Sequence, residues 1–429
     1  MKSHLFYKEE NLELTALGKI PKDWPVVSIG DVAETTSGGT PSRAKKEYYG
    51  GSIPWVKSGE LKDNIIDYTE ETVTDEGLRN SSAKLFQKGT LLVALYGATV
   101  GKTGILGIDA TTNQAICAIM PKQNKLDPNY LRFQITARRN ELISASSGGA
   151  QPNISQGIIR GFRIPLPTVH EQHKIAATLS LVDEAVRKTN EIISNIERLK
   201  KGLMQQLLTR GIGHKEFKDT EIGRIPKEWK VVRLENYIDL LTGYPFRSQE
   251  FSTDTNGVRL VRGINITRGR LRWEEDITKY WKSITRDLDK YLVQKSDLLI
   301  GMDGALVGKN YALASENDLP MLLVQRVARL RAKNGLNQRY LFYLIGSPSF
   351  VNYVNKVNTS SGIAHISSTQ INNFKIPWAP PQEQEKIARM LSAVDKKIEL
   401  ERMIKSNLEK AKLALMNLLL TGKIRIRVD

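Results

Sequence analysis

Two stretches of the chain carry apolar residues that alternate three and four positions apart, which places them on one face of an α-helix. The first begins near Thr168, whose spacing to Glu171 fits a capping box, and runs without proline to about Gly211. The second runs from Glu383 to about Leu420. The pattern predicts two amphipathic helices, each about 60 Å long at 1.5 Å per residue.

Each predicted helix has one apolar face that would be left in water if the helix stood alone. The faces consist of Ile175, Leu179, Val182, Val186, Ile193, Ile196, Leu203 and Leu207 in the first helix, and of Ile387, Leu391, Val394, Ile398, Leu408, Leu415 and Leu419 in the second. We expect the helices to pair antiparallel as a coiled coil, with the first four residues of each group in contact. The alternative is that each helix packs on its own domain. Three polar residues interrupt the apolar faces, namely Thr189, Glu401 and Lys405.

The rest of the chain mixes short alternating or apolar runs, such as "TLLVALYG" and "QAICAIM", with glycine-rich turns. This pattern is typical of strands in mixed α/β domains. One helix is expected at "DPNYLRFQI", with Asp127 as the N-cap residue and Pro128 at the first helical position.

The chain is written twice in tandem. "GKIPKDWPVVSIGDV" at 18–32 returns as "GRIPKEWKVVRLENY" at 223–237, and "FRIPLPTVHEQHKIAATLSLVDEAV" at 162–186 returns as "FKIPWAPPQEQEKIARMLSAVDKKI" at 374–398. We predict an α+β protein with two mixed α/β domains in a pseudo-two-fold arrangement, separated by two long antiparallel helices. The expected domains are residues 1–166 and 213–378, and the expected helical segments are residues 167–212 and 379–429.

The charge favours a polyanionic partner, either nucleic acid or an anionic membrane surface, because 63 Lys and Arg residues outnumber 46 Asp and Glu residues and give a net charge of +17. No apolar run reaches the roughly 18 residues that a membrane span needs, and the N-terminus lacks an apolar secretion signal, so we expect a soluble, cytoplasmic protein. The single cysteine, Cys117, excludes an internal disulfide and a multi-cysteine metal site, and we expect a buried, inert thiol.

A glycine-rich loop in each copy resembles a phosphate-binding loop. In "LYGATVGKTG" only three residues separate Gly97 from Gly101, where the Walker A motif needs four, and the second copy, "DGALVGKN", is equally short and has Asn310 in place of the hydroxyl residue. We interpret these loops as turns at strand ends, built on Gly97, Gly101, Gly304 and Gly308, that present Lys102 and Lys309.

Other catalytic signatures also fail. In "HEQHK", His170 and His173 are three positions apart, where the zinc-protease motif needs four. No Gly-x-Gly-x-x-Gly follows a predicted strand, and no Asn/Asp-Pro-Pro-Tyr/Phe tetrapeptide of an amino-methyltransferase occurs. The sequence therefore predicts no catalytic residue, no metal site and no cofactor in this chain.

With no catalytic signature present, the remaining candidate residues are ones that could bind a ligand. "VRLVRGINITRGRLRW" at 258–273 has five arginines and no acidic residue, as in a half-exposed strand pair, although a solvated sheet edge would have the same composition. Arginine binds guanine edges or phosphates, and the hydroxyl and amide residues of the glycine-rich loops suit similar contacts, although ordinary turns use the same residues. The candidate DNA-facing residues are Thr36, Ser37, Gly38, Arg43, Lys57, Lys102, Ser146, Ser147, Gln151, Arg247, Arg259, Arg262, Arg268, Arg270, Lys309, Ser360 and Ser361.

Several motifs together resemble the specificity (S) subunit of type I restriction-modification systems over nearly the whole chain. They are the two openings "GKIPKDW" and "GRIPKEW", the helix entries "IPLPTVHEQHKIA" and "IPWAPPQEQEKIA", and the helix ends "LMQQLLTRG" and "LMNLLLTG". The resemblance implies two target-recognition domains, each reading one half of a split DNA site, and helices that act as a ruler and as docking surfaces for two modification subunits.

The resemblance also implies that the chemistry belongs to partners. Modification subunits carry S-adenosylmethionine and methylate adenine N6, and restriction subunits add ATP- and magnesium-dependent translocation and cleavage. Because the two copies differ in their loops, we expect an asymmetric double-stranded DNA target with a spacer near one helical turn, about 34 to 36 Å. The alternatives are a nucleotide-dependent DNA-processing enzyme that uses the loops at Gly97 and Gly304, and a non-specific DNA-bridging protein.

Overall fold

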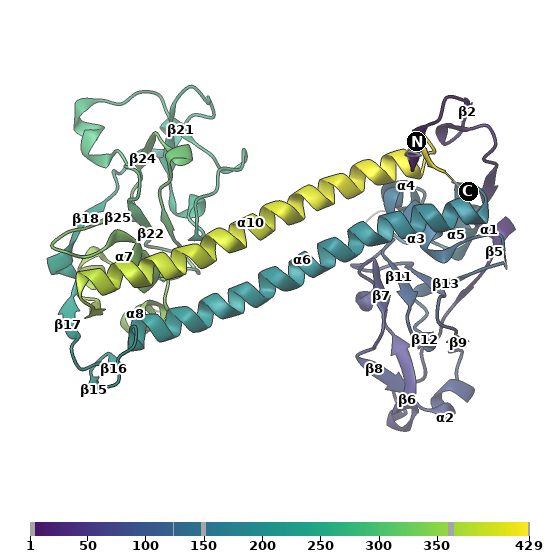
Figure 1. The fold of residues 1–429 in the computed structure, drawn as a ribbon, viewed down its shortest axis with the longest axis horizontal. Helices are drawn as coiled ribbons and strands as arrows, with labels where there is room; N and C mark the ends of the chain where they lie inside the picture. The colour runs from purple at the N-terminus through teal and green to yellow at the C-terminus, as the bar shows by residue number, and fades with distance from the viewer. Residues whose placement is uncertain (1–4, 123, 147–151, 359–363, 428–429) are drawn as a thin grey trace. The chain divides into compact units, whose positions relative to one another are not determined.

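The computed structural model describes residues 5–122, 124–146, 152–358 and 364–427 (Figure 1). The chain divides into two compact units. Unit 1 comprises Met1–Glu191 with Arg402–Asp429, and unit 2 comprises Ile192–Glu401. Each unit therefore contains one copy of the mixed domain together with part of both long helices.

Unit 1 contains a five-stranded sheet in the order β5-β13-β10-β11-β7, antiparallel except for the parallel β11–β7 pair. A four-stranded sheet has the order β8-β6-β12-β9. The strands are β5 (Ala33–Ser37), β6 (Tyr49–Val56), β7 (Asn64–Ile66), β8 (Glu71–Val73), β9 (Leu85–Phe86), β10 (Leu91–Ala94), β11 (Thr103–Leu106), β12 (Ala110–Thr112) and β13 (Ile116–Pro121).

Helices and two-stranded pairs complete unit 1. The helices are α1 (Ile29–Val32), α2 (Asp75–Arg79), α3 (Pro128–Ala137), α4 (Arg139–Ser144) and α5 (Gln156–Gly161). The antiparallel pairs are β1 (Phe6–Lys8) with β27 (Ile424–Ile426), β2 (Leu12–Thr15) with β3 (Gly18–Pro21), and β4 (Val26–Ser28) with β14 (Arg163–Pro165).

Unit 2 repeats the strand order of the five-stranded sheet, and its second sheet has three strands where that of unit 1 has four. Its five-stranded sheet has the order β18-β25-β22-β23-β20, and only the β23–β20 pair is parallel. A second sheet has the order β21-β19-β24. The strands are β18 (Ile238–Thr242), β19 (Val258–Val261), β20 (Arg268–Gly269), β21 (Tyr280–Trp281), β22 (Leu298–Gly301), β23 (Tyr311–Leu313), β24 (Met321–Leu323) and β25 (Val327–Ala332).

The remaining elements of unit 2 also have counterparts in unit 1. They are the pair β15 (Phe217–Thr220) with β16 (Gly223–Pro226), the pair β17 (Lys230–Arg233) with β26 (Lys375–Trp378), and the helices α7 (Gln338–Ile345), α8 (Pro348–Val357) and α9 (Ser368–Asn372). The duplication read from the sequence is thus a duplication of the fold, and the two predicted mixed domains are confirmed.

The predicted strand pair within residues 258–273 is wrong. β19 pairs with β21 and β24, whereas β20 lies in the five-stranded sheet beside β23. Between the two strands the chain makes a 3-10 turn, in which the buried Asn265 side chain accepts a hydrogen bond from the Arg262 backbone N–H (3.1 Å). This turn carries the chain from one sheet to the other, so Arg259 and Arg268 lie in different sheets.

The helix caps predicted from the sequence are present in the structure. Asp127 accepts a hydrogen bond from the Tyr130 backbone N–H (2.7 Å), and Pro128 is the first residue of α3. Thr168 caps α6 through the Glu171 backbone N–H (3.3 Å), and Gly211 takes a left-handed conformation (φ +64°) directly after the helix ends. These residues satisfy backbone groups that a helix end would otherwise leave without partners.

The two long helices are α6 (Val169–Arg210) and α10 (Pro381–Leu419), and they pack together with opposite chain directions. In unit 1 the start of α6, at Ile175 and Leu179, shares a core with the end of α10, at Leu419. In unit 2 the end of α6, at Leu207, shares a core with the start of α10, at Leu391. The predicted pairing is confirmed, and each helix end also packs on a domain.

The predicted apolar faces are buried or half-buried along their whole length. Of the eight residues predicted to make the helix contact, Ile175, Leu179, Ile387, Leu391 and Ile398 are buried, while Val182, Val186 and Val394 are half-buried. The polar interruptions find partners nearby. Thr189 donates to the Ala185 carbonyl of its own helix (2.8 Å), and the buried Glu401 carboxylate pairs with Lys397 (2.6 Å).

An acidic residue at the start of each long helix binds groups that follow the end of the other helix. In unit 1 the buried Glu171 carboxylate accepts two hydrogen bonds from Arg425 (2.9 Å each). In unit 2 Glu383 accepts from Trp229 Nε1 (2.9 Å) and contacts His214 Nε2 (2.9 Å). The adjacent glutamines are buried as well, so the repeated Glu-Gln pair of the helix-entry motif has a structural role.

Cys117 lies in β13 and is fully buried, as the apolar stretch predicts. Burial in apolar surroundings disfavours the thiolate and raises the pKa of Cys117 to about 12. The expected burial is confirmed, and a thiol with a raised pKa stays protonated at neutral pH, as expected of an inert cysteine. Among the described residues, no helix combines the length and the apolar character needed to cross a bilayer.

We predict that Leu179→Ala destabilises the protein by about 2–5 kcal/mol, because it leaves a cavity where α6 packs in the core of unit 1. Leu181→Ala is the matched control on the same helix, since Leu181 is 73% exposed whereas Leu179 is 0% exposed. The control should change the free energy of unfolding, measured in urea, by less than about 0.5 kcal/mol. Equal effects of the two substitutions would contradict the packing described for α6.

Candidate nucleic-acid interface

The first group of predicted interface residues lies at the end of the edge strand β5. Thr36 and Ser37 are half-buried there, and Lys84 Nζ donates a hydrogen bond to Thr36 Oγ1 (2.6 Å). Gly38 is buried, and a Cβ at this position would lie 2.0 Å from Thr112 Oγ1. Gly38 is thus required for close packing, whereas the hydroxyl groups of Thr36 and Ser37 and the Lys84 ammonium are the polar groups at this strand end.

Arg43 and Lys57, which are distant in the sequence, meet at Glu71. Arg43 Nη1 lies 2.6 Å from the Glu71 carboxylate and Lys57 Nζ lies 3.1 Å from it, while Lys57 also pairs with Glu70 (2.8 Å). The hydrogen bond to Glu71 raises the pKa of Arg43. The Arg43 guanidinium also covers the Trp55 ring at 4.8 Å. Two cations and two carboxylates therefore form one group with little net charge.

Lys102 belongs to a similar group around Asp63. Its Nζ lies 3.2 Å from Asp63, which also pairs with Arg139 and accepts a hydrogen bond from the Thr103 backbone N–H (3.0 Å). Burial alone would raise the pKa of Asp63, but the Thr103 hydrogen bond and the Arg139 and Lys102 charges outweigh it, so the pKa lies below its ordinary value of 3.8. The glycine loop is held to the body of unit 1 through this carboxylate.

The glycine-rich loops are turns, as predicted. Gly97, Gly101, Gly304 and Gly308 all have positive φ angles, between +72° and +92°. β10 ends at Ala94 and β22 ends at Gly301, directly before these loops. Lys309 is half-buried after the second loop, and no carboxylate in the described ranges forms an ion pair with it.

In unit 2 the predicted arginines fall into two classes. Arg259 and Arg262 bind the protein itself. Arg259 Nη1 donates to the Asn317 carbonyl (2.9 Å), and Arg262 Nη2 donates to the Ile277 carbonyl (2.5 Å). Burial lowers the pKa of Arg262, whose guanidinium lies 5.6 Å from the centre of the Phe251 ring. These two side chains are therefore partly committed to structural contacts.

Arg247, Arg268 and Arg270 form the second class, because all three are exposed and none has an ion pair with a described residue. Arg270 lines an open cavity of about 460 Å³ together with neighbouring residues of the same loop, namely Thr267, Leu271, Arg272, Trp273 and Glu274. Guanidinium groups of this kind are available to a phosphate or a base edge without first losing a carboxylate partner.

Part of the prediction falls on residues outside the described ranges, namely Ser147, Gln151, Ser360 and Ser361. Ser146 is described, and its hydroxyl donates to the Ile143 carbonyl (2.6 Å) at the end of α4. This hydroxyl is therefore used within unit 1.

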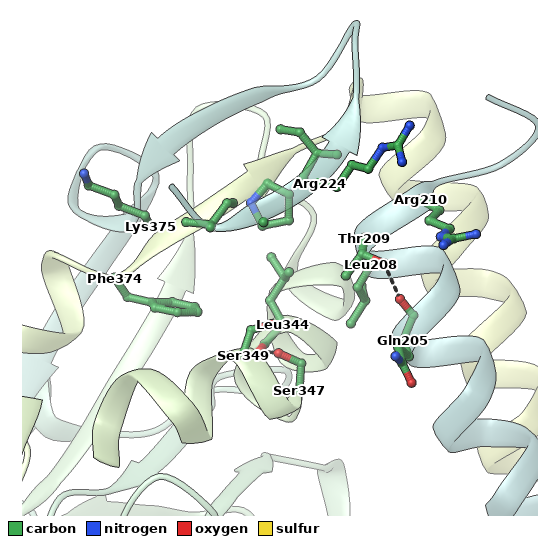
Figure 2. A pocket seen from close by; sticks show the side chains of 14 residues that line it. Gln205, Leu208, Thr209, Arg210, Arg224, Leu344, Ser347, Ser349, Phe374 and Lys375 are labelled. Carbon is green, nitrogen blue, oxygen red and sulfur yellow. Dashed lines mark hydrogen bonds between the residues drawn. The ribbon is translucent and has the colours of Figure 1, made fainter. Parts of the chain in front are cut away.

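A separate cavity of about 300 Å³ lies in unit 2 and contains none of the predicted interface residues (Figure 2). Its lining comes from the end of α6, from β16 and β26 and from the α7–α8 turn. Figure 2 shows Leu208, Leu344 and Phe374 among the apolar walls and Arg210 and Arg224 at one side. The cavity thus lies in unit 2, where the end of α6 meets β16, β26 and the α7–α8 turn. No residue within 258–273 lines it.

One charged group of unit 2 carries no recognisable motif in the sequence. The Asp303 carboxylate pairs with Arg326 Nη1 (2.7 Å) and with His365 Nδ1 (2.5 Å), and these three residues come from three different loops of unit 2. The signal present in the sequence is that these three positions differ between the two copies while the flanking residues correspond.

Comparison with known proteins identifies the family. Residues 21–198 and 226–410 match the family described as the type I restriction modification DNA specificity domain. The chain belongs to the type I restriction-modification specificity (S) subunit family. Members of this family are non-catalytic subunits. The glycine loops of this S subunit are therefore turns of a binding protein.

Two relatives of this S subunit match over most of their length. The type I restriction enzyme MjaVIII specificity subunit of Methanocaldococcus jannaschii is 30% identical over 426 residues, covering 98% of each chain. The type I restriction enzyme EcoKI specificity subunit of Escherichia coli K12 is 21% identical over 393 residues, covering 87% of this S subunit and 82% of the relative.

A crystal structure of the type I restriction-modification S subunit from M. genitalium has the same fold, with a TM-score of 0.60 at 15% identity, covering 96% and 98% of the two chains. As for metal ions, the part of the S subunit that the structure describes holds no group of three or more His, Cys, Asp or Glu residues arranged to bind one.

We predict that Asp63→Asn destabilises the protein at pH 7 by about 1.5–3 kcal/mol, because Arg139 and Lys102 lose a charged acceptor. A carboxyl whose pKa is lowered by folding stabilises the protein above its ordinary pKa, and this stabilisation is lost as the pH falls. The difference in unfolding free energy between wild type and variant should therefore shrink between pH 7 and pH 3. A constant difference would contradict this, and the exposed Asp67→Asn is the control.

Proposed function

We propose that this chain is the DNA-recognition subunit of a type I restriction-modification complex and that it binds an asymmetric, bipartite double-stranded DNA target. Each mixed domain contacts one half-site, and partner subunits perform adenine methylation and restriction. The observation that carries the proposal is the duplicated strand order, on which the loops of the two copies differ in sequence. One frame with two sets of loops suits a protein that reads two different sequences.

The domain division that we propose follows from the same duplication. Residues 1–166 and 213–378 are the target-recognition domains, and residues 167–212 and 379–429 are the spacer segments. The observed limits of α6 and α10, Val169–Arg210 and Pro381–Leu419, support these boundaries.

Charge supports duplex DNA as the ligand. The chain has a net charge of +17, and the exposed Arg247, Arg268 and Arg270 have no carboxylate partner among the described residues. We propose these three, with Lys309, as the first contacts to phosphates or base edges. Arg43, Lys57 and Lys102 would have to exchange a carboxylate for the DNA, so their net contribution to affinity should be smaller.

The partners that we propose are two modification subunits and the restriction subunits. S-adenosylmethionine, ATP and magnesium would be bound by those partners in the cytoplasm, and none is assigned to this chain. Exposed apolar residues on the outer faces of the long helices support a docking role for them. These residues are Leu181, Met403 and Leu413 in unit 1 and Leu199, Met390 and Leu400 in unit 2.

The proposal is tested by co-expressing the chain with its modification subunit in a host without adenine methylation and mapping N6-methyladenine in the genome. We expect methylation at one split, non-palindromic motif. A variant that lacks residues 213–378 provides the control for the origin of the second half-site. Methylation at random adenines, or methylation without this chain, would contradict the proposal.

A second experiment tests the role of the long helices as a spacer. Deleting four residues, about one helical turn, from the middle of α6 and four from the middle of α10 should shorten the preferred DNA spacer and leave both half-sites unchanged. Methyladenine mapping measures the spacer directly. Deletion from only one helix is the control, since it should disturb the pairing of the helices and reduce methylation overall. An unchanged spacer after the double deletion would contradict the ruler role.

A further inference from the structure

In each unit, equivalent backbone hydrogen bonds join three segments. They are the glycine-rich loop after β10 or β22, the turn before β13 or β25, and the segment before α5 or α9. In unit 1 the Leu95 N–H donates to the Ala115 carbonyl, and the Ile154 N–H donates to the Leu95 carbonyl (2.8 Å each). In unit 2 the Met302 N–H donates to the Arg326 carbonyl, and the Ile366 N–H donates to the Met302 carbonyl (2.9 Å each). These two backbone hydrogen bonds are therefore shared by the two copies.

The side chains at this place are not the same. Where unit 1 has Tyr96, Ala115 and Asn153, unit 2 has Asp303, Arg326 and His365 at the matching positions. An aromatic ring, a methyl group and an amide are thus replaced by a carboxylate, a guanidinium and an imidazole. A change of all three chemical groups between loops that share these backbone hydrogen bonds is what a change of recognised sequence requires.

In unit 2 the three side chains form one ordered group. Asp303 is 19% exposed, whereas Arg326 and His365 are 69% and 51% exposed, so the carboxylate lies beneath two accessible side chains. Asp303 Oδ2 accepts from Arg326 Nη1, and Asp303 Oδ1 lies 2.5 Å from His365 Nδ1. Each carboxylate oxygen therefore fixes one partner, which reduces the rotamer freedom that a reading side chain would lose on binding.

The backbone of Arg326 gives a second observation. Its φ angle is +66°, in the left-handed region that non-glycine residues rarely adopt, and it lies in the tight turn between β24 and β25. Glycine would adopt this conformation without strain. A strained backbone held by its surroundings is characteristic of functional positions, where the side chain is needed.

We propose that Asp303, Arg326 and His365 read the half-site that belongs to residues 213–378. Arg326 is the base-reading residue and contacts guanine O6 and N7 in the major groove with the guanidinium N–H groups that do not bind Asp303. Asp303 is a positioning residue for Arg326. His365, whose Nδ1 is held by Asp303, offers Nε2 to an adjacent base or phosphate. This inference rests on the proposed function and assigns its specificity to named side chains.

The test uses the complex of the full-length chain with its modification subunits and compares methylation rates on duplexes that differ from the target at one base pair. Arg326→Ala should reduce discrimination at one guanine of the second half-site by about 10- to 100-fold, as expected for the loss of a bidentate contact. Discrimination in the first half-site should not change. Arg326→Lys keeps the charge but loses the planar fork, and it should show most of the same loss.

Two controls distinguish a loss of base recognition from a loss of positive charge and from a loss of stability. Arg233→Ala removes another exposed arginine of unit 2 that lies near a carboxylate, Glu235 (3.7 Å), and it should leave discrimination unchanged. Asp303→Asn should lower discrimination at the same guanine while the thermal unfolding midpoint of the complex stays close to that of the wild type. An Asp303 that only stabilised the fold would shift the midpoint without changing discrimination.

Two results would overturn the inference alone. Unchanged discrimination in Arg326→Ala would show that Arg326 reads no base. If Arg326→Ala instead weakens binding to all duplexes equally, and the slope of log affinity against log salt concentration falls by about one, Arg326 contacts a phosphate. A wild-type complex that methylates all duplexes equally would overturn the proposed function itself, and with it this inference.

Discussion

Burial of apolar residues from both long helices in each domain core is the constraint on which the fold depends. In unit 1, Leu179 near the start of α6 and Leu419 at the end of α10 belong to one core, and in unit 2, Leu207 and Leu391 belong to the equivalent core. Neither domain is complete with only the helix that follows it in the sequence. The two halves of the chain must therefore fold around each other's helices, although each half repeats the same strand order.

The polar contacts at the helix ends also link the two halves of the chain. Glu171 binds Arg425, and Glu383 binds Trp229 and His214, so each carboxylate at the start of one helix binds groups that follow the end of the other. The two glutamates occupy equivalent positions in the two copies and serve the frame in both. The loop side chains do not hold the helix ends together, so they can differ between the copies.

The sequence predicted what depends on local periodicity and capping. The spacing of apolar residues located both long helices to within a few residues, and Asp127 and Thr168 marked helix starts. The course of residues 258–273 through two different sheets could not be predicted, because it depends on the buried turn at Asn265. The site was only partly predictable. Arginines are visible in a sequence, but their partners, such as Glu71 for Arg43, are 28 residues away and become neighbours only in the fold.

The burial of Cys117 gives the chain a practical property. As the single cysteine, fully buried with a protonated thiol, it should not react with maleimide dyes while the protein is folded. A pair of cysteines introduced at exposed positions, one in each unit, would therefore take up a fluorescent donor and acceptor without background labelling. Energy transfer between the dyes would then report the separation of the two domains in solution, with and without a duplex bound.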